Sequence, residues 1–77
     1  MSNGLIGKNV VFIRDVRDRA IARSGAWPYR SEARAGERGV IVDENEVHKD
    51  VFTVEVEAGE GMGAGLIECV DGDFQIV

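Results

Sequence analysis

Apolar and polar side chains alternate most regularly in the stretch 51–57, with the period of two that indicates a strand with one buried face. The apolar members are Phe52, Val54 and Val56, and the polar members are Thr53, Glu55 and Glu57. Upstream, 40–42 reads Val-Ile-Val after a glycine, and 43–50 between the two segments is almost entirely polar. This pattern predicts a β-hairpin within Gly36–Glu57, around which the other elements can be arranged.

Three further apolar segments predict strands. The uninterrupted run 10–13, Val-Val-Phe-Ile, suits a strand covered on both faces, by a core on one side and by a loop or a neighbouring subunit on the other. In 66–70 the alternation places Ile67 and Cys69 on one face, and 74–77 predicts a short last strand. Asp71-Gly72 before that strand indicates either a two-residue hairpin turn or a single 3₁₀ turn.

The range 16–35 lacks a strand pattern. Asp15–Asp18 resembles a helix N-cap with an acidic residue three places on, and Ser24-Gly25 would end such a helix, but the apolar residues between them form only a ragged stripe. We therefore expect a long loop after the first strand, with a possible short helical turn. Residues 1–6, which are rich in small and polar side chains, are expected to form a loose N-terminal arm.

The chain has 77 residues, of which 44% are hydrophobic and 30% charged, as expected for one soluble globular domain spanning 1–77. At this size a single core only just offsets the chain entropy, so a closed topology or a partner subunit is needed. A single cysteine and the lack of an apolar run of spanning length predict a cytoplasmic chain with no membrane partner.

The net charge of −5 conceals a gradient along the chain. Residues 1–38 contain eight basic and four acidic side chains, a net +4, whereas residues 39–77 contain one basic and ten acidic, a net −9. Two interpretations remain open. Either a basic loop folds back over an acidic sheet, or the molecule is dipolar and its two faces meet different partners or each other between subunits.

The order of these elements resembles the SH3-like small β-barrel. The resemblance lies in five short strands, a long loop after the first strand and a brief turn before a very short last strand. The segments that carry it are 7–13, 35–42, 51–56 and 73–77. The Gly36-x-x-Gly39-x-Ile-Val piece is also similar to the KOW-type version of ribosomal and transcription-elongation proteins. The resemblance implies an all-β fold, a five-stranded SH3-like barrel.

Departures from these families limit what the resemblance implies about function. The tyrosine and tryptophan signature of SH3 domains that bind proline-rich peptides is absent, and RNA-binding KOW-type domains are usually basic, unlike this acidic chain. The chain is also similar in size and type to the tetrameric type II dihydrofolate reductases, but their Val-Gln-Ile-Tyr pore motif has no counterpart here. Neither peptide recognition nor reductase activity is therefore carried over.

The arginine-rich loop is the best candidate binding site. Arginine beside flat aromatic rings is the composition both of protein hot spots and of platforms for single-stranded nucleic acid. The candidate binding residues are Arg23, Trp27, Tyr29, Arg30 and Arg34. The alternative is that Trp27 caps the barrel end while the arginines pair with acidic strands beneath.

No catalytic residue, metal site or cofactor is predicted. His48, in a charged turn, lacks convergent metal ligands, and Cys69 lies within a strand pattern as a small core residue. We expect a non-enzymatic protein-binding or assembly module that self-associates or binds another protein. Single-stranded nucleic-acid binding is the alternative, disfavoured by the acidic net charge, and an oligomeric small-barrel enzyme with a shared pore is the second alternative.

Overall fold

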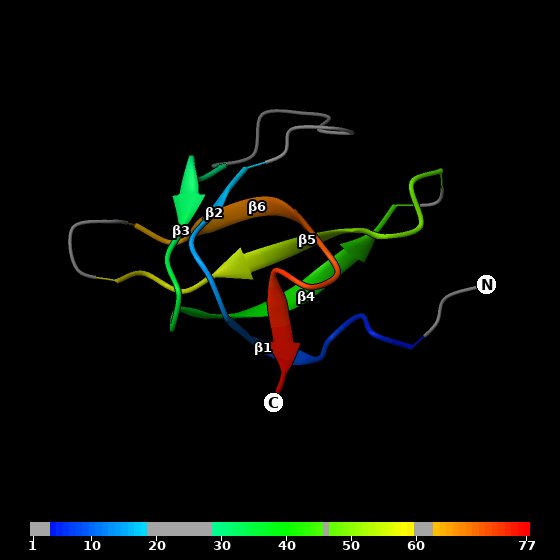
Figure 1. The fold of residues 1–77 in the computed structure, drawn as a ribbon, viewed down its shortest axis with the longest axis horizontal. Coiled ribbons are helices and arrows are strands. Elements are labelled where there is room, and N and C mark those ends of the chain that lie inside the picture. The colour runs from blue at the N-terminus through cyan, green and yellow to red at the C-terminus, as the bar shows by residue number, and fades with distance from the viewer. Residues whose placement is uncertain (1–3, 19–28, 46, 60–62) are drawn as a thin grey trace.

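Short β-strands make up the regular structure of this chain. The computed structural model describes residues 4–18, 29–45, 47–59 and 63–77, and within them it contains strands and no helix (Figure 1). The strands are β1 (Asn9–Phe12), β2 (Val16–Arg17), β3 (Glu32–Ala33), β4 (Arg38–Glu44), β5 (Val51–Val56), β6 (Gly65–Val70) and β7 (Phe74–Ile76). The predicted all-β fold is confirmed for these residues, none of which belongs to a helix long and apolar enough to cross a membrane.

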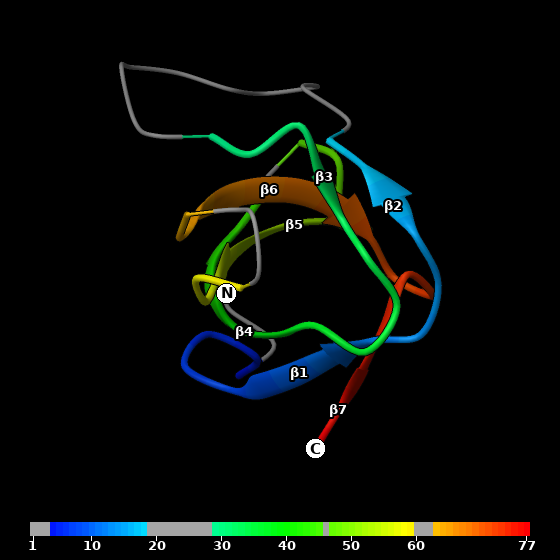
Figure 2. The same ribbon diagram turned by 90° about the vertical axis from the view of Figure 1, so that its left-hand side faces the viewer.

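Five strands form one antiparallel sheet in the order β6-β5-β4-β1-β7, and they correspond to the five predicted strands. The predicted hairpin is β4–β5, in which Ile41 lies opposite Val54, and a register shift after Ile41 leaves Val42 as an extra, exposed residue. The sheet curls around its core (Figure 2). Its strand pairing leaves β6 and β7 as separate edges, while β2 and β3 form a second, two-stranded sheet.

The concave face of the curled sheet holds the core. The alternation seen in the sequence places every second side chain of β1, β5 and β6 inside. The core residues include Val10, Phe12, Ile41, Val54, Val56, Ile67 and Cys69. Phe74 joins them through edge-to-face contacts with Phe12 and Phe52, at ring-centroid distances of 6.5 and 5.6 Å. With a radius of gyration of 11.3 Å the domain is compact.

The outer side of β1 is covered less than its apolar run suggests. Val10 and Phe12 are buried, but Val11 is only half-buried and Ile13 is 53% exposed. At the N-terminal end, Leu5 packs against the core and the Gly7 N–H donates to the Ile41 carbonyl oxygen at 2.8 Å. The described part of the chain thus supplies a full cover for one face of β1 and a partial cover for the other.

The topology decides two points that the sequence left open: Asp71-Gly72 forms a single turn and no hairpin, and the chain after Asp15 continues as a strand and not as a helix. Since β7 pairs with β1, Asp71-Gly72 does not join a hairpin; it lies in a β-turn closed by the Asp73 N–H on the Val70 oxygen at 3.0 Å. No helix starts after Asp15 either, because the next two residues form β2 and the Asp15 carboxylate accepts the Ala35 N–H instead. The Ser24-Gly25 stop lies outside the described residues.

Candidate functional site

The predicted arginine-rich loop leaves and rejoins the domain through the two-stranded β2–β3 ribbon. Val16 pairs with Ala33 and Arg17 with Glu32, and the Asp18 N–H extends the ladder to the Ser31 oxygen at 2.9 Å. The buried side chains Val16 and Ala33 attach the ribbon to the main core. The ends of the loop are therefore fixed by backbone pairing and by the core.

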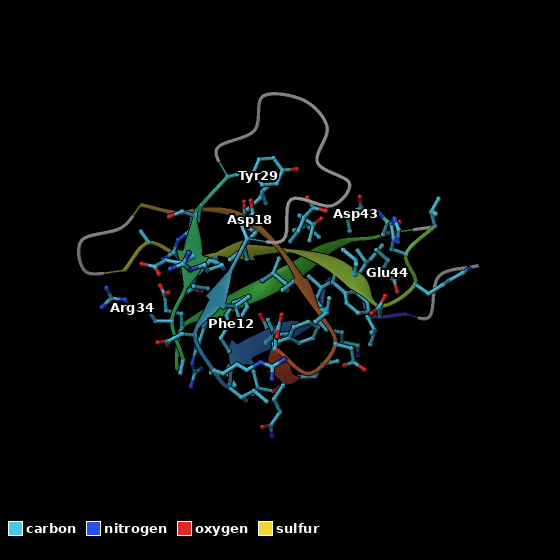
Figure 3. All side chains as sticks on the ribbon, turned by 45° about the horizontal axis from the view of Figure 1, so that its top comes forward. Phe12, Asp18, Tyr29, Arg34, Asp43 and Glu44 are labelled. Carbon is cyan, nitrogen blue, oxygen red and sulfur yellow. The ribbon has the colours of Figure 1, made fainter. Side chains whose placement is uncertain are left out.

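Beyond the ribbon, both ends of the loop meet the outer edge of β6. Tyr29 forms a parallel bridge with Leu66, whose carbonyl oxygen accepts the Arg30 N–H at 2.8 Å. On the other side of the loop, the Asp18 carboxylate accepts the Glu68 N–H at 2.9 Å. Figure 3 shows Asp18 and Tyr29 beside this strand. These contacts satisfy backbone groups that β6 would otherwise present at the edge of the sheet.

Asp73 completes this edge. Its carboxylate is fully buried: Oδ2 accepts the Val70 N–H at 3.0 Å, and Oδ1 accepts Nε and Nη2 of Arg14 at 2.9 and 2.6 Å. The side chain of Arg14 is 58% exposed, so the ion pair lies at the boundary between core and solvent. Through this one carboxylate the end of β6 is joined to the segment that follows β1.

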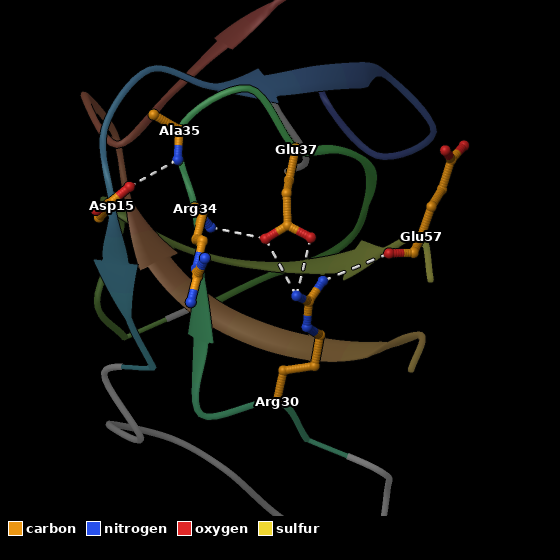
Figure 4. Close-up of polar contacts among 6 residues, drawn as sticks. All are labelled: Asp15, Arg30, Arg34, Ala35, Glu37 and Glu57. Carbon is orange, nitrogen blue, oxygen red and sulfur yellow. Dashed lines mark hydrogen bonds and ion pairs between the residues drawn. The ribbon is translucent and has the colours of Figure 1, made fainter. Parts of the chain in front are cut away.

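The Glu37 carboxylate is the centre of the polar contacts around the loop (Figure 4). It accepts Nη2 of Arg30 at 2.9 and 3.1 Å and the backbone N–H of Arg34 at 2.7 Å. The side chains of Arg30 and Glu37 are only 5% and 19% exposed, and Nη1 of Arg30 also donates to the Glu57 carbonyl oxygen at 3.4 Å. A buried, charge-assisted pair of this kind fixes the position of the Arg30 side chain.

A tight turn places the Arg34 N–H at this carboxylate. The Glu37 N–H donates to the Arg34 oxygen at 3.0 Å, and Gly36, the third residue of the turn, has a φ of 92°. Glycine is favoured there because other residues rarely adopt that conformation. The Ala35 N–H between them is bound by the Asp15 carboxylate at 2.9 Å. The turn is thus stabilised by carboxylates on both sides.

The five predicted binding residues are only partly brought together in the described part of the chain. Arg23 and Trp27 lie outside the described residues. Tyr29 is half-buried, and Arg30 is buried with its guanidinium on Glu37. Arg34 is exposed and projects away from the sheet (Figure 3). Arg30 therefore behaves as the alternative interpretation expects, paired inside the fold, while Arg34 stays available to a ligand.

Sequence reasoning missed the carboxylates that organise this region. These residues are Asp15, Asp18, Glu37 and Asp73. The signal available was weak: three of the four lie in the basic half of the chain, next to the loop that they fix. An acidic residue isolated among arginines is a plausible internal ion-pair partner, and Glu37 is such a residue.

The remaining candidate chemistry lies elsewhere. His48 is exposed in the β4–β5 turn, where its backbone N–H donates to Oδ1 of Asn45 at 2.6 Å, and the acidic Asp43 and Glu44 lie near the same end (Figure 3). Among the described residues, no group of three or more His, Cys, Asp and Glu side chains is arranged to hold a metal ion.

Comparisons with protein-family models, curated proteins and solved structures find no significant match to this chain.

Proposed function

We propose that this chain is a five-stranded SH3-like barrel and that it is a non-enzymatic module which binds protein, including a second copy of itself. The element order supports the barrel, because a long excursion separates β1 from β4 and a brief turn precedes the short β7. Asp73 further supports it, since its side chain connects the end of β6 to the β1–β7 side of the curled sheet. Strand pairing leaves β6 and β7 apart, so in the proposed barrel the contacts of the Asp73 side chain link the two ends of the sheet.

The observation that carries the binding proposal is an apolar strip on the outer side of the sheet. It consists of Val11, Ile13, Val40 and Val77, and we call it the outer strip. Val11 lies on the outer face of β1, and Ile13 follows the end of β1, where its N–H continues the ladder to the Asp73 oxygen. Asn9 links the strip across the sheet, since it pairs with Val40 and its carbonyl oxygen accepts the Val77 N–H at 3.0 Å.

The outer strip is exposed enough to be a contact surface. Ile13 and Val77 are 53% and 62% exposed, and Val11 and Val40 are half-buried. Polar residues interrupt the strip, since Val11 lies opposite Arg38 and Gln75. Exposed apolar side chains on one face of a small domain nevertheless favour an interaction surface, because covering them removes apolar area from water. A partner on this side would give β1 the second cover that its sequence predicts.

Light scattering over a range of protein concentrations, at low and at high salt, tests the proposal. We expect concentration-dependent self-association that persists at high salt, since apolar contacts are not screened. Ile13→Ser should weaken it, whereas Val47→Ser, at the 82% exposed Val47 of the β4–β5 turn, should not. A strict monomer at every concentration and ionic strength would overturn the proposal of self-association, and equal association of the wild type and Ile13→Ser would exclude the outer strip as its contact surface.

Exposed arginines at both ends of the loop favour a second candidate function, binding of single-stranded nucleic acid. Arg17 and Arg34 face solvent, whereas Arg30 is committed to Glu37. Retention on single-stranded DNA or RNA should fall as salt rises and should be weakened by Trp27→Ala or Arg34→Ala. No retention at low salt would remove this candidate.

A further inference from the structure

The two edges of the main sheet differ. The edge of β6 is covered by Tyr29, Arg30 and the side chains of Asp18 and Asp73, as described above. The other edge, β7, lies beside β1 and has no neighbouring strand on its far side among the described residues (Figure 2). Because the β6 edge is covered and the β7 edge is open, the geometry points to β7 as a site for strand pairing.

The backbone direction of β7 follows from its pairing with β1. The Ile13 N–H donates to Asp73 and the Val77 N–H donates to Asn9, while Gln75 lies opposite Val11. The odd-numbered residues 73, 75 and 77 therefore bond to β1. Because bonding directions alternate along a strand, the N–H and C=O groups of residues 74 and 76 point to the open edge. In the described part of the chain no partner binds these four groups.

Apart from its length of three residues, β7 has none of the usual protections against edge pairing in the described part of the chain. Natural edge strands are blocked by lysine, proline, bulges or a covering segment. The sequence 74–77 is Phe-Gln-Ile-Val, with no charge and no proline, and Ile76 is 42% exposed. An uncharged edge with free backbone groups is a ready template for another strand.

We propose that β7 pairs antiparallel with β7 of a second copy, about a two-fold axis that passes beside Gln75. In this register Phe74 of each copy lies opposite Ile76 of the other, so that all four outward backbone groups of each copy are bonded. Two five-stranded sheets become one continuous sheet, and the outer strips of the two copies lie on the same side of it. This inference rests on the self-association proposed above and adds to it a contact at the β7 edge that is distinct from the outer strip.

The sequence of β7 fits a second copy better than an unrelated strand. Phe74 and Ile76 flank Gln75 symmetrically, so a two-fold pairing satisfies the outward groups of both copies equally. Gln75 meets its own counterpart, and an amide side chain both donates and accepts hydrogen bonds. The chain carries a net charge of −5, so two copies repel each other, and an uncharged segment is where they can meet without facing like charges.

A charge-pair experiment tests this register. Gln75 is exposed, so Gln75→Lys and Gln75→Glu leave the core unchanged. Each substitution places like charges opposite each other at the axis, and each alone should weaken self-association at least tenfold at low salt. Mixing the two variants should restore a dimer that contains one copy of each, detected by native mass spectrometry or by sedimentation of a fluorescently labelled copy.

A backbone test is independent of charge. Ile76→Pro removes an N–H that points to the open edge and leaves the bonds to β1 intact, so it should abolish the dimer while circular dichroism stays native. Ile76→Thr, which keeps the N–H and the β-branched shape, is the matched control and should still associate. Should the proline variant fail to fold, the mixing experiment alone decides.

Three results separate the possible failures. If the wild type forms a dimer but a mixture of Gln75→Lys and Gln75→Glu does not, the interface lies elsewhere. That result would overturn this inference while self-association stands. A monomer at all concentrations would remove both. Pairing of β7 with an extended peptide of another protein, in place of a second copy, would also overturn the inference. Since three edge residues bury less than a standard interface, we expect a concentration-dependent equilibrium.

Discussion

Replacing Glu37 by glutamine tests whether the arginine-rich loop is held by an internal ion pair. The substitution keeps the shape of the side chain and removes its charge. In the native protein both oxygens are used: Arg30 bonds to Oε1 and Oε2, and the Arg34 N–H bonds to Oε2. An amide offers one acceptor and turns an N–H₂ group toward donors, so at least one of these contacts is lost.

The magnitude follows from the burial of the pair. A hydrogen bond to a charged group contributes about 1.5–3 kcal/mol, and removing one partner of a fully buried pair costs about 3–5 kcal/mol. Here the Arg30 side chain is 5% exposed but Glu37 is 19% exposed, and Arg30 keeps a 3.4 Å contact with the Glu57 carbonyl oxygen. We therefore expect Glu37→Gln to lower the free energy of unfolding by about 2–4 kcal/mol.

Urea denaturation followed by tryptophan fluorescence, together with thermal melting, measures this loss. At about 4–8 °C per kcal/mol for a domain of this size, the melting temperature should fall by roughly 8–32 °C. Glu57→Gln is the matched control: it removes the same charge nearby, but only the backbone oxygen of Glu57 contacts Arg30, so it should change stability by less than about 0.5 kcal/mol. Equal effects of the two substitutions, or none from Glu37→Gln, would refute the structural role of the pair.

Three further predictions test the fold. Gly39→Ala should destabilise by about 1–3 kcal/mol or more in urea, because the new Cβ would lie 2.5 Å from a backbone oxygen of β5, whereas Gly63→Ala meets nothing within 4 Å and should be nearly neutral. Asp73→Ala should cost about 2–3 kcal/mol by the same assay, since the buried carboxylate binds an N–H and an arginine, and the exposed Asp71→Ala should cost far less. Cys69 is fully buried and should be alkylated much more slowly in native protein than in urea; equal rates would contradict its placement.

The five strands of the main sheet were predictable because their signal is periodic. Alternation in 51–57 and 66–70 indicates which side chains share a face, and both segments form strands in which the predicted apolar faces are buried. The β2–β3 ribbon was not predictable, because each of its strands is two residues long and contributes only one buried side chain, Val16 and Ala33. Periodicity needs several repeats, and a two-residue strand offers none.

The roles of the arginines could not be read from the sequence. Arg30 and Arg34 have the same chemistry and lie in the same loop, yet Arg30 is buried and Arg34 is exposed. The difference depends on the distant contact of the loop with Leu66, which directs the Arg30 side chain toward Glu37. Composition identifies a cluster of cations, whereas only the tertiary fold shows which of them are neutralised inside it.

The burial of Arg30 also changes how binding by the loop has to be tested. Arg30→Ala would remove a structural ion pair, so lost binding in that variant would report unfolding as readily as a lost contact. Arg34→Ala removes only an exposed side chain, because the N–H that binds Glu37 belongs to the backbone. Gln75→Lys acts at the other edge of the sheet, away from the contacts of the loop with β6. If the loop binds a ligand and β7 binds a second copy, Arg34→Ala should weaken the first alone and Gln75→Lys the second alone. Loss of both activities in either variant would mean that the two sites are one.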